Sequence, residues 1–372
     1  MLIKFDIDSD LYKQIENLIK DGKYSDVIQF IKVATNNQLQ EEKAGNNPIK
    51  LIDESGKSFS ENIGDIMKGT IIEEQERLKK SLSEFVINES EIEKKDVDFI
   101  WSFYNRLFPV KIAIFQLANL VTPNEPWVDL DEWKETAVSM AQDWCRVLKE
   151  NEIAEEIRMN EKLTIGLPTH PMELDKVKGK RMKAKLERKI ASSKSRFMEQ
   201  FVGRYNKKND TFEGACFGMG LISVKITGTS SLVSLTDLGK EFALLENPII
   251  HNRKMLHAFS NEEIKLIYKE IIPQFKAEQQ IIKDVINELK NKSLTSDEIQ
   301  KIFEGYKKFI FEYYSTEPEK LDAKKREEKI TQSRVATMGR LSELKIVNWE
   351  IKERGISHYS LNQEKCQFLG II

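Results

Sequence analysis

The chain has 372 residues, which is long for one domain and predicts two to four domains. Its 58 Lys and Arg residues nearly balance its 60 Asp and Glu residues, so the formal net charge of −2 neither indicates nor excludes a nucleic-acid partner. No apolar run is long enough for a transmembrane helix, and the mixed, acidic start is unlike a signal peptide, so no membrane partner is expected. The 3 widely spaced cysteines fit a reducing, cytoplasmic location better than a disulfide framework or a zinc site.

The chain is predicted to be mainly α-helical and multi-domain, with short β-hairpins. Prolines and glycines are few for this length, at 9 and 17, and Lys, Glu, Ile and Leu are abundant, as is typical of helical proteins. Hairpins are expected where apolar and polar residues alternate on both sides of a turn.

Residues 1–42 predict a small module in which a short alternating strand precedes two amphipathic helices separated by a glycine turn. This order resembles the ribbon-helix-helix family, in which two chains pair their strands and outward side chains of the strands enter the major groove of DNA. In this sequence those side chains are Lys4, Asp6 and Asp8, and two acidic residues out of three oppose contact with phosphates. The alternative is a helical hairpin with a leading edge strand.

Residues 43–95 predict a linker and a solvated helix. Residues 96–175 form the next unit, which begins with an apolar stripe at helical spacing over 97–108. Asp129 is expected to cap a short helix, and a longer helix is expected over 136–151. This unit is acidic, because residues 110–175 hold thirteen Asp and Glu against six Lys and Arg. That balance favours contact with protein over contact with DNA.

The charge balance reverses at the start of the following region, residues 176–250. Thirteen Lys and Arg but only two Glu lie between Lys176 and Lys208. A solvated helix face would also be charged, but here the acidic residues that would neutralise it are nearly absent, which favours binding of a polyanion. The residues expected to anchor phosphates are Lys178, Lys180, Arg181, Lys183, Lys185, Arg188, Lys189, Lys194 and Arg196.

A hairpin and a helix are predicted directly after this basic run. Strands over 223–226 and 232–235 flank a glycine turn, and Thr236 caps the helix that follows. The order Gly-Leu-Ile, hairpin, Leu-Thr-x-x-Gly-Lys-x-Phe resembles the wing and closing helix of winged-helix regulators. The resemblance implies that 176–250 is a basic winged-helix unit, and the helices of 96–175 are read as an acidic unit of similar type.

Residues 251–372 are predicted to be a helical connector and a last winged-helix unit. Within it, Val335, Met338, Leu341 and Leu344 form an apolar helical stripe, and a hairpin with a charged tip follows. A helix followed directly by such a hairpin resembles the recognition helix and wing of a winged-helix DNA-binding domain. The resemblance implies DNA contacts from polar residues on the other helix face and from the hairpin tip: Ser333, Arg334, Thr337, Arg340 and Arg354.

No catalytic or metal-binding residue is predicted, because none of the four histidines has the spacing of a metal ligand or of a nucleophile–base pair. No cofactor is expected. The sequence therefore predicts a non-enzymatic protein that binds double-stranded DNA as a homodimer and regulates or organises it. Two alternatives remain: an interaction scaffold for a protein or for RNA, and an enzyme whose site is dispersed along the chain.

Overall fold

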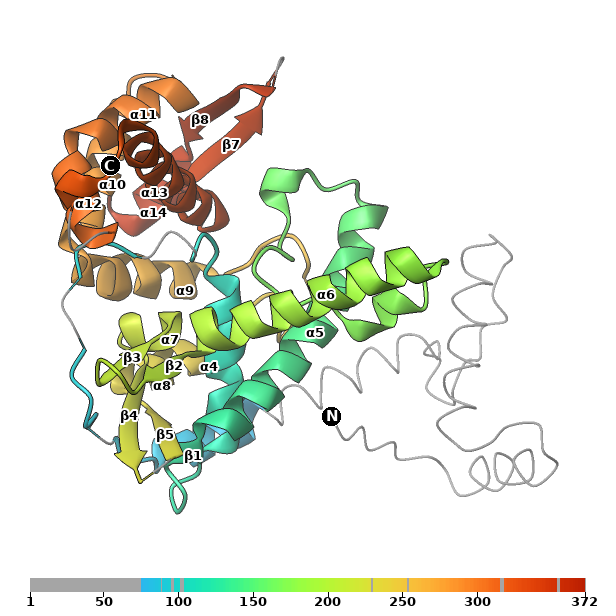
Figure 1. Cartoon of the computed structure of the whole chain (residues 1–372). Helices are drawn as coiled ribbons and strands as arrows, with labels where there is room; N and C mark the ends of the chain where they lie inside the picture. The colour runs from blue at the N-terminus through green and yellow to red at the C-terminus, as the bar shows by residue number, and fades with distance from the viewer. Residues whose placement is uncertain are drawn as a thin grey trace, which may run out of the picture. The chain divides into compact units, whose positions relative to one another are not determined.

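The computed structural model describes residues 75–372, except 88, 95–96, 101–103, 229, 253, 315–317, 353–354 and 372 (Figure 1). All described residues belong to one compact unit, Ile71–Ile372. The predicted N-terminal module, residues 1–42, most of the predicted linker and Arg354 lie outside the described residues. The described part is mainly helical with small antiparallel sheets, as the sequence predicts. None of its helices is both long and apolar enough to cross a bilayer.

The first lobe, residues 108–244, is built on three long helical segments and a three-stranded sheet. Its elements in order are α4 (Phe108–Leu120), β1 (Val128–Asp129), α5 (Leu130–Ala154), η1 (Met159–Glu161), η2 (Pro171–Leu174), α6 (Lys180–Arg196), η3 (Phe197–Val202), β2 (Arg204–Asn206), β3 (Thr211–Glu213), α7 (Ala215–Gly218), β4 (Ile222–Thr227), β5 (Ser230–Leu235) and α8 (Asp237–Leu244). The sheet order is β1-β5-β4, and β2 and β3 form a separate hairpin.

The predicted boundary at residue 175 is not a boundary in the structure. Val128, from the acidic half, pairs with Val233, from the basic half, so both halves share one sheet. Their buried side chains also belong to one continuous core. The acidic half supplies the first two helices and the first strand, and the basic half supplies the third helix and the hairpin, so neither half is complete without the other.

The second lobe, residues 276–369, has a related order of elements. It consists of α10 (Lys276–Leu289), β6 (Leu294–Thr295), α11 (Ser296–Gly305), α12 (Lys307–Tyr314), η6 (Pro318–Lys320), α13 (Ala323–Glu343), β7 (Val347–Ile351), β8 (Ser357–Leu361) and α14 (Gln363–Leu369). The sheet order is β6-β8-β7. Between the lobes lie α9 (Asn261–Leu266), η4 (Ile267–Ile271) and η5 (Ile272–Gln274).

The two lobes share a topology. In each, a short strand leads into the second helix and pairs with the last strand of the hairpin, at Leu294 with Tyr359 in the second lobe. In each, a long helix precedes the hairpin, and in the first lobe β2, β3 and α7 are inserted between them. This helix is the third α-helix of the first lobe and the fourth of the second lobe, where the short α12 comes before it. The helices α6 and α13 therefore occupy equivalent positions in the two lobes.

Local capping explains where several helices begin, and the predicted caps at Asp129 and Thr236 are confirmed. Thr236 accepts a hydrogen bond from the amide of Gly239, and Ser260 and Thr295 form capping boxes with acidic residues three positions later. Asp129 also caps a helix as predicted, but that helix, α5, runs unbroken to Ala154. The expected separate short helix is wrong, because no glycine or proline interrupts the chain after Leu130.

The apolar stripe over 97–108 does not form a helix in its described part. Residues 97–100 and 104–107 are irregular and lie between the lobes, where Phe99, Ile100, Tyr104 and Leu107 are buried. These apolar residues are buried by neighbouring elements on several sides, so their helical spacing does not indicate a helix here.

Candidate nucleic-acid interface

The basic run folds largely into α6, a 17-residue helix without a single buried residue. Arg181, Lys185, Arg188 and Arg196 recur at separations of four, three and eight residues, which places them on one helix face. The opposite face is half-buried through Leu186. The only acidic residue of α6, Glu187, lies off the basic face, since it follows Lys185 by two positions.

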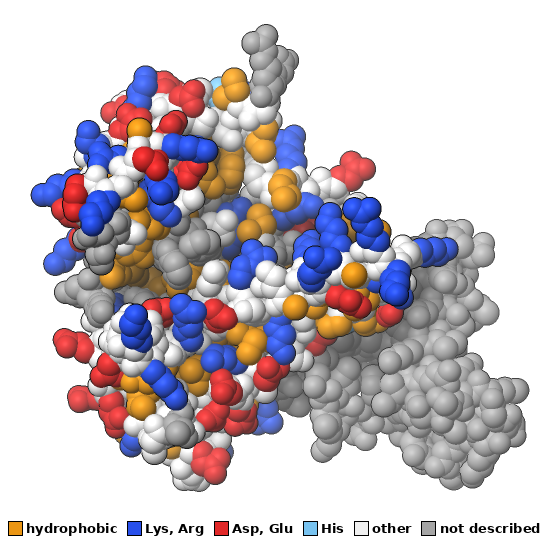
Figure 2. All heavy atoms as spheres, in the orientation of Figure 1, with side chains coloured by type: hydrophobic (Ala, Val, Ile, Leu, Met, Phe, Trp, Pro, Cys, Tyr) orange, Lys and Arg blue, Asp and Glu red, His pale blue; other side chains and the backbone are white. Residues whose placement is uncertain are grey.

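Most charges of α6 have no acidic partner among the described residues. Of the nine predicted phosphate anchors, only Lys194 forms a salt bridge within the described part of the chain, to Glu135 at 2.7 Å. The Nε atoms of Arg188 and Arg196 donate to backbone carbonyls of α6 itself. Figure 2 shows Lys and Arg side chains gathered along this helix. Arg181, Lys185, Arg188 and Arg196 thus form an exposed basic surface, which we call the α6 face. Lys180, Lys183 and Lys194 lie on other sides of the helix, and Lys178 precedes it.

The C-terminal continuation of α6 fixes the helix to the lobe. The chain passes from α6 into the π-helical turn η3, where Phe197, Phe201 and Val202 are buried. The rings of Phe197 and Phe201 lie 5.9 Å apart, and Phe201 also packs 5.8 Å from the ring of Tyr104. The helix is therefore anchored at one end and solvent-exposed over its basic length.

The equivalent helix of the second lobe is placed very differently, and this corrects the predicted base-reading surface. Ser333, Thr337 and Arg340 are only 6%, 2% and 3% exposed. The Arg340 guanidinium forms an ion pair with Glu278 and donates to the Tyr104 carbonyl at 2.7 Å. Thr337 donates to the same Glu278 carboxylate at 3.0 Å. These three side chains are enclosed by protein and do not form a surface that could reach base edges.

The remaining residues of that prediction have mixed outcomes. Arg334 is half-buried, and its Nε donates to the Gln300 side chain at 2.7 Å. Val335 was expected in the apolar core stripe but is 38% exposed, whereas Met338, Leu341 and Leu344 are buried as predicted. Arg334 is thus the one member of the predicted helix set that reaches the surface.

The C-terminal half of α13 serves instead as the junction between the lobes. Glu343 accepts hydrogen bonds from the backbone amides of Leu107 and Phe108, at 2.6 and 3.2 Å, and so caps α4 of the first lobe. Burial raises the pKa of the Glu343 carboxyl to about 6, although Arg106 nearby lowers it. Gly339 permits the close approach, because a Cβ there would lie 2.5 Å from the Arg106 guanidinium.

The junction extends to the second hairpin. Arg106 donates to the backbone carbonyl of Asn160 at 2.9 Å, and the Asn160 side chain donates to the Trp349 carbonyl in β7 at 2.8 Å. Sequence reasoning missed Glu278, Glu343 and Arg106, because a charged residue beside an apolar stripe looks the same whether water or a second lobe covers it. The sequence feature that could have indicated this junction is Gly339, because a glycine inside a helical pattern often marks close packing.

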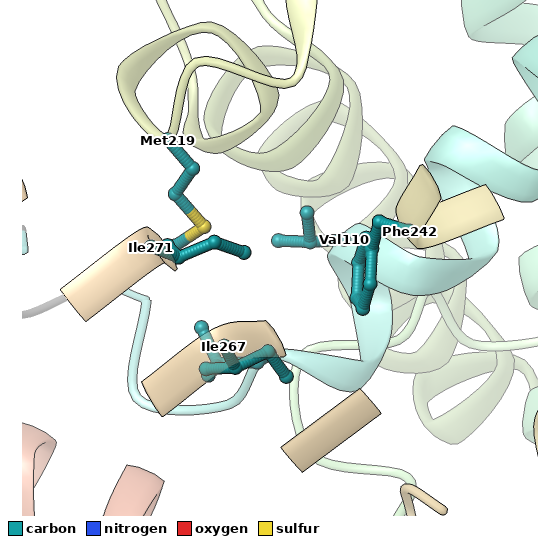
Figure 3. Close-up of a pocket in the computed structure, with 6 residues that line it drawn as sticks. Val110, Met219, Phe242, Ile267 and Ile271 are labelled. Carbon is teal, nitrogen blue, oxygen red and sulfur yellow. The ribbon is translucent and has the colours of Figure 1, made fainter. Parts of the chain in front are cut away.

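A small cavity beside α4 has an entirely apolar lining, with Met219 and Ile271 facing Val110 and Phe242 (Figure 3). Such a cavity stays dry and lacks groups that could orient a polar ligand. Across the described residues, no group of three or more His, Cys, Asp or Glu side chains is arranged to hold a metal ion.

Comparison with models of protein families, with curated proteins and with solved structures gave no match, so function has to be argued from this geometry.

Proposed function

We propose that this protein binds double-stranded DNA through the α6 face of a winged-helix first lobe. The observation that carries the proposal is the uncompensated charge of α6, on which Arg181, Lys185, Arg188 and Arg196 share one exposed face. Phosphates of a duplex would supply the missing counter-charges, and binding would release the counterions condensed on them.

The topology of the lobes supports the same proposal. Apart from the inserted β2, β3 and α7, the first lobe has the order helix, strand, helix, helix, hairpin, with its first strand pairing with the last strand of the hairpin, and this order resembles that of winged-helix domains. In that arrangement the third helix is the one that meets the duplex, and α6 holds this position in the first lobe. A B-DNA major groove, about 12 Å wide, admits an α-helix.

The protein would act by occupancy, without catalysis, as a dimeric regulator or organiser of DNA. Two copies bound to one duplex would each contribute an α6 face. A second candidate function is an interaction scaffold, in which the same exposed basic residues of α6 would bind an acidic protein or RNA.

The first test removes three charges from the α6 face. The variant Arg181→Gln, Lys185→Gln, Arg188→Gln should bind a random duplex about a hundredfold more weakly at moderate salt, with a slope of log K against log[salt] reduced by about 2.7. Fluorescence anisotropy over a salt series measures both. The charge-matched control is Lys283→Gln, Lys301→Gln, Lys324→Gln, which alters exposed lysines of the second lobe.

Three ligands of equal length separate the two candidate functions. Preference for duplex DNA over duplex RNA and single-stranded DNA supports the proposal, because the deep, narrow major groove of A-form RNA excludes a helix. Equal binding of duplex RNA, or an affinity of wild-type protein that does not change with salt, would favour the scaffold.

A further inference from the structure

The β2–β3 hairpin is an insertion between the third helix and the wing of the first lobe, and the α6 face does not include it. Arg204 pairs with Glu213 and Asn206 pairs with Thr211 across its strands. The turn between them carries Lys207 and Lys208, both exposed. A single residue, Gly203, lies between the end of η3 and the start of β2.

The attachment of the hairpin to α6–η3 is tight at its base. Gly203 has a φ of +136°, and a Cβ there would lie 2.8 Å from the Glu213 carbonyl oxygen. Gly214, on the returning strand, has a φ of +142°, and a Cβ there would lie 2.5 Å from the Gly203 Cα atom. Only glycine allows both backbones to meet in this way. The hairpin therefore keeps a fixed position relative to the helix.

The acidic side chains at the base of the hairpin are neutralised internally. Arg204 forms salt bridges with Glu199 at 3.0 Å and with Glu213 at 2.9 Å. The hydroxyl of Tyr205 donates to Asp210 at 2.5 Å, and Asn206 accepts from the backbone amide of Lys208 at 3.2 Å, which orders the turn. The polar groups of the hairpin thus hold its shape.

The two lysines of the turn are not used in these internal salt bridges. Within the described part of the chain, neither Lys207 nor Lys208 takes part in a salt bridge, and both are exposed on an ordered turn. Figure 2 shows Lys and Arg side chains over both α6 and the region of β2 and β3 on one face of the molecule. Because the backbone of this turn is already ordered, binding an anion there costs little further backbone entropy.

The spacing suits a continuous polyanion. Gly203 follows Arg196 by seven positions, which span about 10 Å along a helix, and the three-residue strand β2 adds about 10 Å. The turn therefore lies within about 20 Å of the end of α6, a distance over which a duplex presents about twelve phosphates. We infer that the β2–β3 turn is a second phosphate-binding element, which contacts the same duplex as α6 through Lys207 and Lys208.

This inference rests on the proposed function, and its test separates the two. Lys207→Gln, Lys208→Gln should bind duplex DNA roughly tenfold more weakly at moderate salt, with a salt slope reduced by about 1.8, since each phosphate contact contributes about 0.9. Lys207→Glu, Lys208→Glu should weaken binding further by repulsion. The matched control is Lys283→Gln, Lys301→Gln, and thermal unfolding confirms that each variant folds.

The outcomes are distinct. Loss of affinity and slope in the hairpin variants, with an unchanged control, supports the second element. If the hairpin variants bind like wild type while the α6 variant loses binding, the inference is wrong and the proposed function stands. If wild-type protein does not bind duplex DNA at all, the proposed function fails and the inference fails with it.

Discussion

The helices α6 and α13 occupy the same place in two lobes of the same topology, yet their surroundings are opposite. No residue of α6 is buried, whereas α13 is buried on all sides from Ala336 to Leu341. Most charges of α6 lack an acidic partner among the described residues, whereas Arg340 of α13 is enclosed with Glu278. The long helix before the hairpin can thus either offer an exposed surface to a ligand or pack between the two lobes. Its position in the fold does not determine which of the two it does.

The largest expected effect comes from breaking the buried pair of α13. Arg340→Ala leaves the Glu278 carboxylate buried without its partner, so we expect a loss of about 3–5 kcal/mol in the free energy of unfolding, measured by chemical denaturation. Replacing both residues, as in Arg340→Met with Glu278→Leu, should recover only part of it, because Thr337 and the Ile100 amide then lose their buried acceptor. A stable Arg340→Ala protein that has lost sequence preference for DNA would reinstate α13 as a reading helix.

The second effect concerns the pH dependence of the lobe junction. The folded pKa of Glu343 is raised to about 6 from 4.5, so the protonated form favours folding. Protonation of Glu343 contributes about 2 kcal/mol to the free energy of unfolding at a pH below 4.5, the unfolded pKa. This contribution is lost as the pH rises through about 6, the folded pKa. Glu343→Gln should flatten this part of the stability curve between pH 4 and 7. An identical slope in both proteins would show that Glu343 does not titrate there.

The smallest expected effect compares the exposed Lys185 of α6 with the half-buried Arg334 of α13. Lys185→Ala should weaken duplex binding several-fold and lower the salt slope by about 1. Arg334→Ala should change affinity less than twofold, because its guanidinium is already held by Gln300. Binding isotherms on two duplexes of different sequence measure both changes. A larger effect of Arg334→Ala, on one duplex only, would mean that the second lobe also reads DNA.

Local features of the fold were predictable because local chemistry determines them. The caps at Thr236 and Thr295 and the strands of both hairpins follow from turn residues and alternation within a few positions. The start of α13 could not be predicted in this way, since its first turn, at Ala323, is charged and carries no apolar stripe.

Long-range assembly was not predictable in the same way. The pairing of Val128 with Val233 joins segments that differ sharply in charge, so composition suggested two domains where one exists. For the candidate site, the basic face of α6 follows from helical periodicity. The burial of Thr337 and Arg340 does not, because a polar helix face has the same sequence whether water or another lobe covers it.

The cap that Glu343 provides for α4 has a consequence for how the chain is made. Leu107 offers no side-chain cap to this helix, and its first turn has no acidic residue, so the amide donors are satisfied from a position 236 residues later in the chain. During synthesis the first lobe emerges well before its cap exists. A fragment ending near residue 250 should therefore fold poorly, and native structure in the first lobe should appear only once the second lobe has left the ribosome.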